Sequence, residues 1–332
     1  MTLNAPRVTG EHGTIVPVSL IATRGLTKSF PQVTALDALT IDVGAGVTGL
    51  VGANGAGKST LIKILLGLLP STSGSASVLD LDVDRQGTQI RARVGYMPEH
   101  DCLPPDVSAT ELIVHLARIS GLPPDAARER SADVLRHVGL AEERYRPIGG
   151  YSTGMRQRVK LAQALVHDPE LVFLDEPTNG LDPLGRDEML TLIRRIGTEF
   201  GIAVLVTSHL LGELERTSDS IIVIDAGRLL RASETAEFTQ TTGLLTVEVQ
   251  DLDGGNSRDR LGRALAEKGL RVMPSGGLLQ VEIVDESTYD VVRDLVADLG
   301  LGLVRLQQAR HRIEDIFTVD YAAEGVPHGD PT

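Results

Sequence analysis

Cysteine is scarce in this sequence, with Cys102 the one thiol among 332 residues. A single cysteine excludes a disulfide within the chain, and low cysteine usage fits a reducing compartment. A lone thiol is no evidence of redox chemistry. We interpret Cys102 as a packing residue.

Long apolar runs are also absent. Apolar stretches such as 171–174, 202–206 and 221–224 have the length of strands, and none approaches the ~20 residues that a membrane-spanning helix needs. The first residues contain Arg7 and Glu11 without a continuous apolar core, so no secretory signal is visible. We therefore expect a chain that does not cross a bilayer by itself and stays in the cytosol.

Basic residues are the minority among the charges. The chain has 32 Lys and Arg against 45 Asp and Glu, a formal net charge of −13. This balance disfavours nonspecific binding to nucleic acid or to anionic lipid as the main activity, although it leaves room for a local basic patch. We expect no nucleic-acid partner.

The length and an apolar fraction of 42% allow two domains with sizeable cores. Up to about residue 230, β-rich apolar runs alternate with helical patterns, as expected for an α/β layer with a largely parallel sheet. The predicted order is a flexible leader (1–18), an α/β domain (19–240) with a helical insertion (about 100–165), an accessory α+β domain (241–322) and a loose tail (323–332).

The helical insertion has clear boundary signals. Ser108 and Glu111 have the spacing of a capping box, Gly121 closes the first helix and Gly139 ends a second, charged helix. We therefore predict two helices between residues 107 and 140.

The accessory domain alternates strand, helix, strand, strand, helix and strand, which predicts a split βαβ, ferredoxin-like fold. The predicted strands are 245–250, about 271–273, 278–284 and 301–307, and the predicted helices are 257–268 and 287–299. Beyond them, Ile313, Ile316 and Phe317 space one face of a last helix. We expect this face to pack on the α/β domain, against a second subunit, or in the small domain's own core.

The most informative motif follows an apolar strand at residues 47–51 and matches G-x-x-x-x-G-K-[ST]: Gly52-Ala53-Asn54-Gly55-Ala56-Gly57-Lys58-Ser59-Thr60. Glycines let consecutive N–H groups turn toward an oxyanion, and the helix that starts near Lys58 points its positive end at the same anion. Lys58 would neutralise β- and γ-phosphates and Ser59 would ligate Mg²⁺. The alternative is a Gly-rich surface turn with an exposed lysine.

Two carboxylates follow a second apolar strand at residues 171–174. Asp175 is placed to hold Mg²⁺, and Glu176 to polarise the water that attacks the γ-phosphate. The alternative is a solvated strand end or a helix cap.

A third helix start lies at Ser152, in Gly150-Tyr151-Ser152-Thr153-Gly154-Met155-Arg156-Gln157. Ser152 is a good N-cap, and that could be its whole role. Yet a hydroxyl, a close-approach glycine and a free helix N-terminus also form a second phosphate site. One chain cannot sensibly use both phosphate sites on one nucleotide.

Taken in order, these motifs, with Gly180-Leu181-Asp182 and His209, resemble the ATP-binding subunit of ABC transporters over about residues 20–230. The resemblance implies a P-loop NTPase fold of the ABC type, with ATP and Mg²⁺ as ligands. It also implies two subunits stacked head to tail, so that Ser152, Gly154 and Met155 of one chain face the γ-phosphate held by the other. The usual L-S-G-G-Q is Y-S-T-G-M here, a form similar to the ABC-2 export branch.

The resemblance carries over to three further positions, and one position departs from it. Phe30 matches the aromatic that stacks on adenine, His209 the switch histidine at the γ-phosphate, and Asp182 the loop that crosses the dimer interface. Glu99 departs from the family pattern, because Gly95-Tyr96-Met97-Pro98-Glu99 stands where G-Y-x-P-Q is usual; as a carboxylate it can still reach a cation.

The resemblance implies an ATP-hydrolysing subunit that dimerises on ATP and drives a separate membrane permease, as part of an exporter. It would be attached peripherally to the cytoplasmic face of the membrane through that permease. The alternative is a soluble ABC ATPase that acts as a nucleotide-gated regulator or remodelling factor through its accessory domain.

Overall fold

The computed structural model describes residues 19–235, 241–250, 256–275, 277–285 and 287–310. The chain divides into two compact units, and the division falls directly after Thr235. The leader 1–18, the apolar face of Ile313, Ile316 and Phe317, and the tail 323–332 lie outside the described residues.

The first unit contains a four-stranded antiparallel sheet in the order β2-β1-β4-β5. Its strands are β1 (Ile21–Phe30), β2 (Val33–Val43), β4 (Ser73–Val78) and β5 (Leu81–Asp82). The sequence pattern predicts a largely parallel sheet and gives no sign of this antiparallel one. The central pair of this sheet, β1 with β4, joins residues that lie far apart along the chain, such as Ile21 and Val78, and no local pattern records this pair.

A six-stranded sheet forms the centre of the same unit, in the order β10-β9-β3-β8-β7-β6. Its strands are β3 (Val47–Val51), β6 (Val94–Met97), β7 (Leu171–Leu174), β8 (Ala203–Ser208), β9 (Ser220–Asp225) and β10 (Arg228–Glu234). All pairs are parallel except β9 with β10. β3, β7 and β8 are buried along their whole length, as expected for strands covered on both faces.

Helix α1 (Lys58–Leu65) joins the two sheets. Its side chains Leu61, Ile62 and Ile64 are fully buried in one apolar cluster with residues of both sheets, among them Leu39 and Leu205. The burial fixes the direction in which α1 leaves β3, and so the shape of the loop between them. The other helices beside the sheets are α2 (Gly87–Arg93), α6 (Pro183–Thr198) and α7 (Leu211–Thr217).

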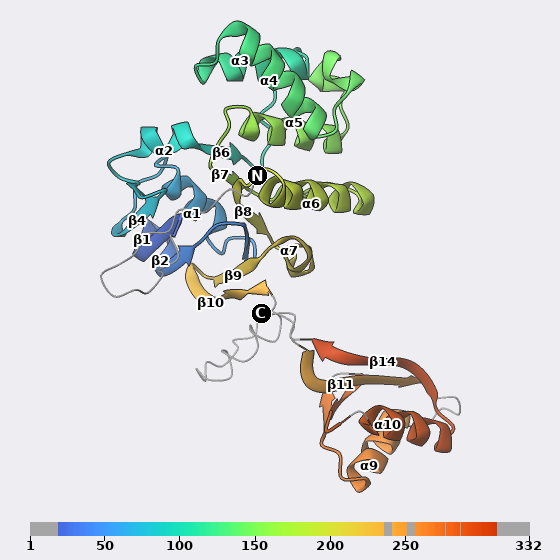
Figure 1. Cartoon of the computed structure of the whole chain (residues 1–332). Coiled ribbons are helices and arrows are strands. Elements are labelled where there is room, and N and C mark those ends of the chain that lie inside the picture. Colours follow the sequence, from blue (N-terminus) through green and yellow to red (C-terminus); the bar gives the residue numbers. More distant parts are fainter. Residues whose placement is uncertain (1–18, 236–240, 251–255, 276, 286, 311–332) are drawn as a thin grey trace, which may run out of the picture. The chain divides into compact units, whose positions relative to one another are not determined.

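The predicted helical insertion is present and lies beyond the end of the sheets (Figure 1). It comprises α3 (Ala109–Ile119), α4 (Pro124–His137), the 3₁₀ turns η1 (Glu142–Tyr145) and η2 (Ile148–Gly150), and α5 (Thr153–Leu165). Ser108 and Glu111 form the capping box, and Gly121 and Gly139 adopt positive φ angles after α3 and α4. The capping box and the two glycine turns are therefore present where the sequence predicts them. Cys102, predicted to be a packing residue, is exposed instead, because the segment between β6 and α3 runs over the surface.

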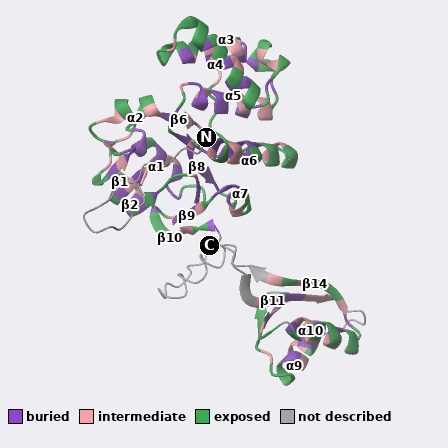
Figure 2. Ribbon diagram, in the orientation of Figure 1, coloured by how far each residue is buried: buried purple, intermediate pink, exposed green. Residues whose placement is uncertain are grey.

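The described residues of the second unit form six elements around their own core. They are β11 (Thr241–Gln250), α9 (Ser257–Glu267), β12 (Val272–Ser275), β13 (Leu278–Glu282), α10 (Ser287–Asp298) and β14 (Gly302–Arg310). The strands are antiparallel in the order β12-β13-β11-β14. Leu261 of α9 and Val292 of α10 belong to one buried cluster with Leu245 and Val281. Figure 2 shows this buried layer between the helices and the strands.

A chain that ends at residue 240 should fold by itself and bind ATP as the full chain does, because each unit has a separate buried core. Its melting temperature should lie within about 4 °C of the corresponding transition of the full chain, the shift that ~1 kcal/mol produces in a domain of this size. Thermal unfolding followed by circular dichroism and ATP titration would measure both. A soluble, folded truncation without ATP affinity would contradict the independence of the units.

Candidate functional site

The loop between β3 and α1 needs glycine at two places. Gly57 has a φ of +103°, and a Cβ atom there would lie 2.3 Å from the carbonyl oxygen of Ala35. A Cβ on Gly52 would lie 2.5 Å from the carbonyl oxygen of Ile224. Larger residues would therefore displace the loop from both neighbouring strands. The loop lines a cavity of about 270 Å³ with Ala53, Asn54, Gly55, Gly57, Lys58, Ser59 and Thr60.

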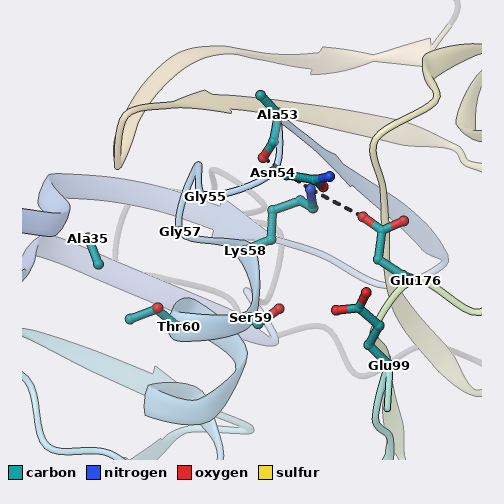
Figure 3. A pocket seen from close by; sticks show the side chains of 10 residues that line it. All are labelled: Ala35, Ala53, Asn54, Gly55, Gly57, Lys58, Ser59, Thr60, Glu99 and Glu176. Atoms are coloured by element: carbon teal, nitrogen blue, oxygen red, sulfur yellow. Dashed lines mark hydrogen bonds and ion pairs between the residues drawn. The ribbon is translucent and has the colours of Figure 1, made fainter. Parts of the chain in front are cut away.

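Lys58 lies at the centre of this cavity (Figure 3). Its ammonium group donates to the carbonyl oxygen of Gly52 at 2.7 Å and pairs with the Glu176 carboxylate at 3.2 Å. Only 6% of the Lys58 side chain is exposed. A buried ammonium needs such partners because desolvation penalises an unpaired charge. The cation is thus already fixed at the place where phosphate oxygens would bind.

Ser59 and Asp175 come together as the sequence predicted for a magnesium site. The Ser59 hydroxyl donates to Asp175 Oδ1 at 3.2 Å, and the Thr207 hydroxyl donates to the same oxygen at 2.9 Å. Burial raises the pKa of Asp175, and these two hydrogen bonds oppose the rise. Within the described ranges no three His, Cys, Asp or Glu side chains gather as a metal site. A hydroxyl with one carboxylate is nonetheless the set that suits Mg²⁺ when phosphates supply further oxygens.

Glu176 and His209 also meet. Glu176 Oε2 lies 2.9 Å from His209 Nδ1, while its other oxygen faces Lys58. Glu176 has a φ of +50°, which is rare for a residue with a side chain. Its amide donates to the Thr207 hydroxyl at 2.8 Å, and this bond holds the unusual backbone turn. One carboxylate therefore lies between the loop lysine and the histidine.

Glu99 follows β6 and points into the same cavity as Glu176 (Figure 3). Its carboxylate accepts a hydrogen bond from the Asn179 amide at 3.2 Å, and its backbone carbonyl accepts one from Lys160 at 2.8 Å. Burial lowers the pKa of Lys160. Glu99 thus reaches the phosphate side of the site in spite of its departure from the usual glutamine.

Ser152, Gly154, Met155 and Asp182 lie together around a second cavity of about 500 Å³. Ser152 caps α5 by accepting from the amide of Met155 at 3.3 Å, and Asp182 caps α6 by accepting from that of Gly185 at 2.9 Å. This cavity shares no lining residue with the first. One chain therefore presents two separate candidate phosphate sites.

Phe30 is not among the residues that line the first cavity. It ends β1 with 40% of its side chain exposed, and the Lys28 ammonium lies 5.1 Å from the centre of its ring. Lys28 in turn donates to the carbonyl oxygen of Pro70 at 2.7 Å. Phe30 is accessible to a flat ligand, and it is not an ordinary core phenylalanine.

Three polar residues of the site were missed at the level of sequence: Thr207, Asn179 and Lys160. Thr207 lies near the end of the buried strand β8, and Lys160 lies on the buried face of α5. A lysine among buried apolar positions is a signal that could have been used, because a buried charge requires a partner. Asn179 lies in a turn and carries no comparable signal.

Comparison with known proteins agrees with this geometry. The family model described as ABC transporter matches residues 36–179. The daunorubicin/doxorubicin resistance ATP-binding protein DrrA of Streptomyces peucetius is 36% identical over 248 residues, which cover 74% of this chain and 75% of the relative. This chain belongs to the ABC transporter family. As an ATP-binding subunit of that family it is an ATPase.

Further relatives and solved structures extend the family match. The bacitracin transport ATP-binding protein BcrA of Bacillus licheniformis is 38% identical over 64% of this chain and 69% of its own length. The structure of cbiO1 from Clostridium perfringens, described as part of an ABC transporter complex, is 27% identical with a TM-score of 0.61, over 66% of this chain and 90% of that one. A dimeric ATP-binding cassette bound to ADP and phosphate has a TM-score of 0.60 at 22% identity over 65% of this chain and 98% of its own; it shows the fold alone. Among the residues described here, no helix is long and apolar enough to cross a bilayer.

Lys58→Ala should weaken ATP binding about 10- to 100-fold, because charge-assisted hydrogen bonds contribute ~1.5–3 kcal/mol. Calorimetric titration with ATP would measure the change. Lys63→Ala is the matched control, since Lys63 lies on the same helix and is exposed. Equal affinities of the Lys58 variant and the wild type would contradict the phosphate-loop assignment.

Glu99→Gln should keep ATPase activity but raise the Mg²⁺ concentration for half-maximal turnover about 5-fold, equivalent to ~1 kcal/mol. The reason is that a neutral amide oxygen attracts the cation less than a carboxylate does. Glu199→Gln serves as control, because Glu199 is exposed and pairs with Arg195 at the surface. An identical Mg²⁺ titration in the Glu99 variant would place this residue outside the metal's ligands.

Proposed function

We propose that this chain is the ATP-hydrolysing subunit of an ABC exporter. The observation that carries the proposal is the meeting of Lys58, Glu176 and His209 beside the glycine-rich loop, with Ser59 and Asp175 in contact next to them. The functions named for relatives, which include daunorubicin/doxorubicin resistance, bacitracin transport and Nod factor export, support export.

ATP would bind with its phosphates in the loop and its base on Phe30. Lys58 and the loop amides would hold the β- and γ-phosphates, and the exposed ring of Phe30 would stack on adenine. Ser59 and Asp175 would hold Mg²⁺, with Glu99 within reach of the same cavity. The metal would supply charge neutralisation at the phosphates.

Glu176 would act as the general base for hydrolysis. Its carboxylate would orient a water toward the γ-phosphate and accept the proton as the water attacks. His209, 2.9 Å away through Nδ1, would fix the carboxylate and contact the γ-phosphate with the rest of its ring. The bond from the Glu176 amide to Thr207 keeps this carboxylate at the strand end.

Two copies would complete each nucleotide site. The second cavity, with Ser152, Gly154, Met155 and Asp182, suits the γ-phosphate of a nucleotide held by another chain. Because it shares no lining residue with the first cavity, we assign it to the nucleotide of the other chain and not to that of its own loop. The dimeric cassette among the structural neighbours supports a pair of chains.

The working complex would include a separate membrane permease, moved by closure of the ATPase pair. The chain would then be a peripheral protein of the cytoplasmic membrane face, attached through protein contacts. A soluble regulator is the alternative, and the transport functions named for the relatives favour the permease instead.

We also propose a division into an ATPase domain (19–240) and an accessory ferredoxin-like α+β domain (241–322). The strand order β12-β13-β11-β14, with both helices sharing one core, supports a split βαβ arrangement. The daunorubicin resistance ATP-binding protein DrrA3 of Streptomyces coeruleorubidus aligns with 90% of this chain, a span too long to lie within the ATPase domain alone. The accessory domain carries none of the proposed nucleotide contacts and would steady the dimer or regulate it.

Glu176→Gln should retain ATP binding and lower the rate of hydrolysis about 10²- to 10⁴-fold, because it removes the general base and leaves Asp175 in place. The ATP-bound dimer should then accumulate. Size-exclusion chromatography with ATP and Mg²⁺, beside a phosphate-release assay, would measure both effects, with Glu199→Gln as the matched control. If the variant stays monomeric with ATP and turns over near the wild-type rate, the role of Glu176 is wrong.

A further inference from the structure

A buried carboxylate behind the site has no role in the mechanism described so far. Glu213 of α7 has only 7% of its surface exposed. Its Oε2 accepts hydrogen bonds from the hydroxyls of Thr178 at 2.8 Å and Ser208 at 2.9 Å. Its Oε1 pairs with the guanidinium of Arg186 at 3.4 Å.

The two hydroxyls belong to the two loops that carry Glu176 and His209. Thr178 lies two residues after Glu176, and Ser208 directly precedes His209. One oxygen of Glu213 therefore connects the segment after β7 with the end of β8. These two segments carry Glu176 and His209, whose side chains are 2.9 Å apart. The Ser208 hydroxyl also accepts from the amide of Leu210 at 3.0 Å, which fixes the loop beyond the histidine.

The third partner connects this carboxylate to the loop of Asp182. Arg186 lies in the first turns of α6, the helix that Asp182 caps, and it also donates to the carbonyl oxygen of Leu181 at 3.4 Å. Hydrogen bonds to an ionised acceptor are about twice as strong as neutral ones. The hydroxyls of Thr178 and Ser208 donate such bonds to Glu213. Arg186 lies beside the other carboxylate oxygen as an ion pair without a hydrogen bond. The charge of the carboxylate therefore strengthens its hold on all three segments, which a neutral side chain would hold weakly.

We propose that Glu213 is a positioning residue for ATP hydrolysis, which fixes Glu176 and His209 relative to each other and couples them to the 180–182 loop through Arg186. This inference rests on the proposed function. Glu213 does not touch the nucleotide cavity, so its effect falls on the rate of the chemical step and leaves ATP affinity unchanged. Small displacements of catalytic groups are sufficient for this, since ~1 Å of misplacement can lower a rate about 100-fold.

The test compares Glu213→Gln with the control Glu199→Gln in the full-length chain. The expected result is a kcat lowered about 10- to 100-fold, with the Kd for ATP within about 2-fold of the wild type and a melting temperature lowered by no more than about 4 °C in the absence of nucleotide, the shift of ~1 kcal/mol. An unchanged kcat overturns the inference. A parallel loss of ATP affinity and of melting temperature also overturns it, because Glu213 would then serve only the fold.

A second pair of variants keeps the inference testable if Glu213→Gln fails to fold. Thr178→Val removes the hydroxyl and should lower kcat, while Thr178→Ser retains it and should restore kcat to the wild-type value. Equal rates for the two variants contradict the inference.

A double-variant comparison separates positioning from a general defect. With His209→Ala, Glu213→Gln should lower kcat much less than in the wild type, because the contact that it positions is already lost. Fully additive effects overturn the inference. If the wild-type chain shows no ATPase activity, the proposed function itself is refuted. If the wild type is active and the Glu213 variants have the same kcat as the wild type, only the role of Glu213 is refuted.

Discussion

The buried ion pair between Lys58 and Glu176 is the interaction on which the site depends. With 6% and 7% of their side chains exposed, both charged groups are buried, and each offsets the desolvation penalty of the other. The pair holds the glycine-rich loop and the end of β7 together before any ligand arrives. Under the proposed roles, a phosphate in the loop would compete with Glu176 for the Lys58 ammonium, so one cation would link ligand binding to the position of this carboxylate.

The order of the parallel strands brings the remaining groups to this pair. β8 lies between β3 and β7, and the carboxyl ends of all three meet at one edge. The loop follows β3, Asp175 and Glu176 follow β7, and Thr207 with His209 stands at the end of β8. Thr207 bonds to both carboxylate-bearing residues, so the middle strand aligns the outer two.

The sequence was informative wherever the chemistry is local. The start of α1 at Lys58, the capping box at Ser108 and the carboxylates after β7 were predicted from neighbouring residues, and the structure has them there. The ion pair of Lys58 and Glu176, the pairing of β1 with β4, and the partners of Glu213 were not predictable, because each joins residues distant along the chain. Cys102 was also predicted wrongly. Cysteine is often buried, but residue type alone does not reveal that this segment is exposed.

Ala35 connects the two sheets at the cavity. It belongs to β2 of the antiparallel sheet, yet it lines the cavity, and its carbonyl is the atom that requires glycine at position 57. β2 also pairs with β1, which ends in Phe30. Under the proposed roles, the base is recognised by the antiparallel sheet and the phosphates are cleaved at the parallel one. Substitutions near the β1–β2 turn would therefore change nucleotide selectivity during evolution and leave the residues for hydrolysis intact. Position 57 is the exception, because its contact with Ala35 constrains both sheets.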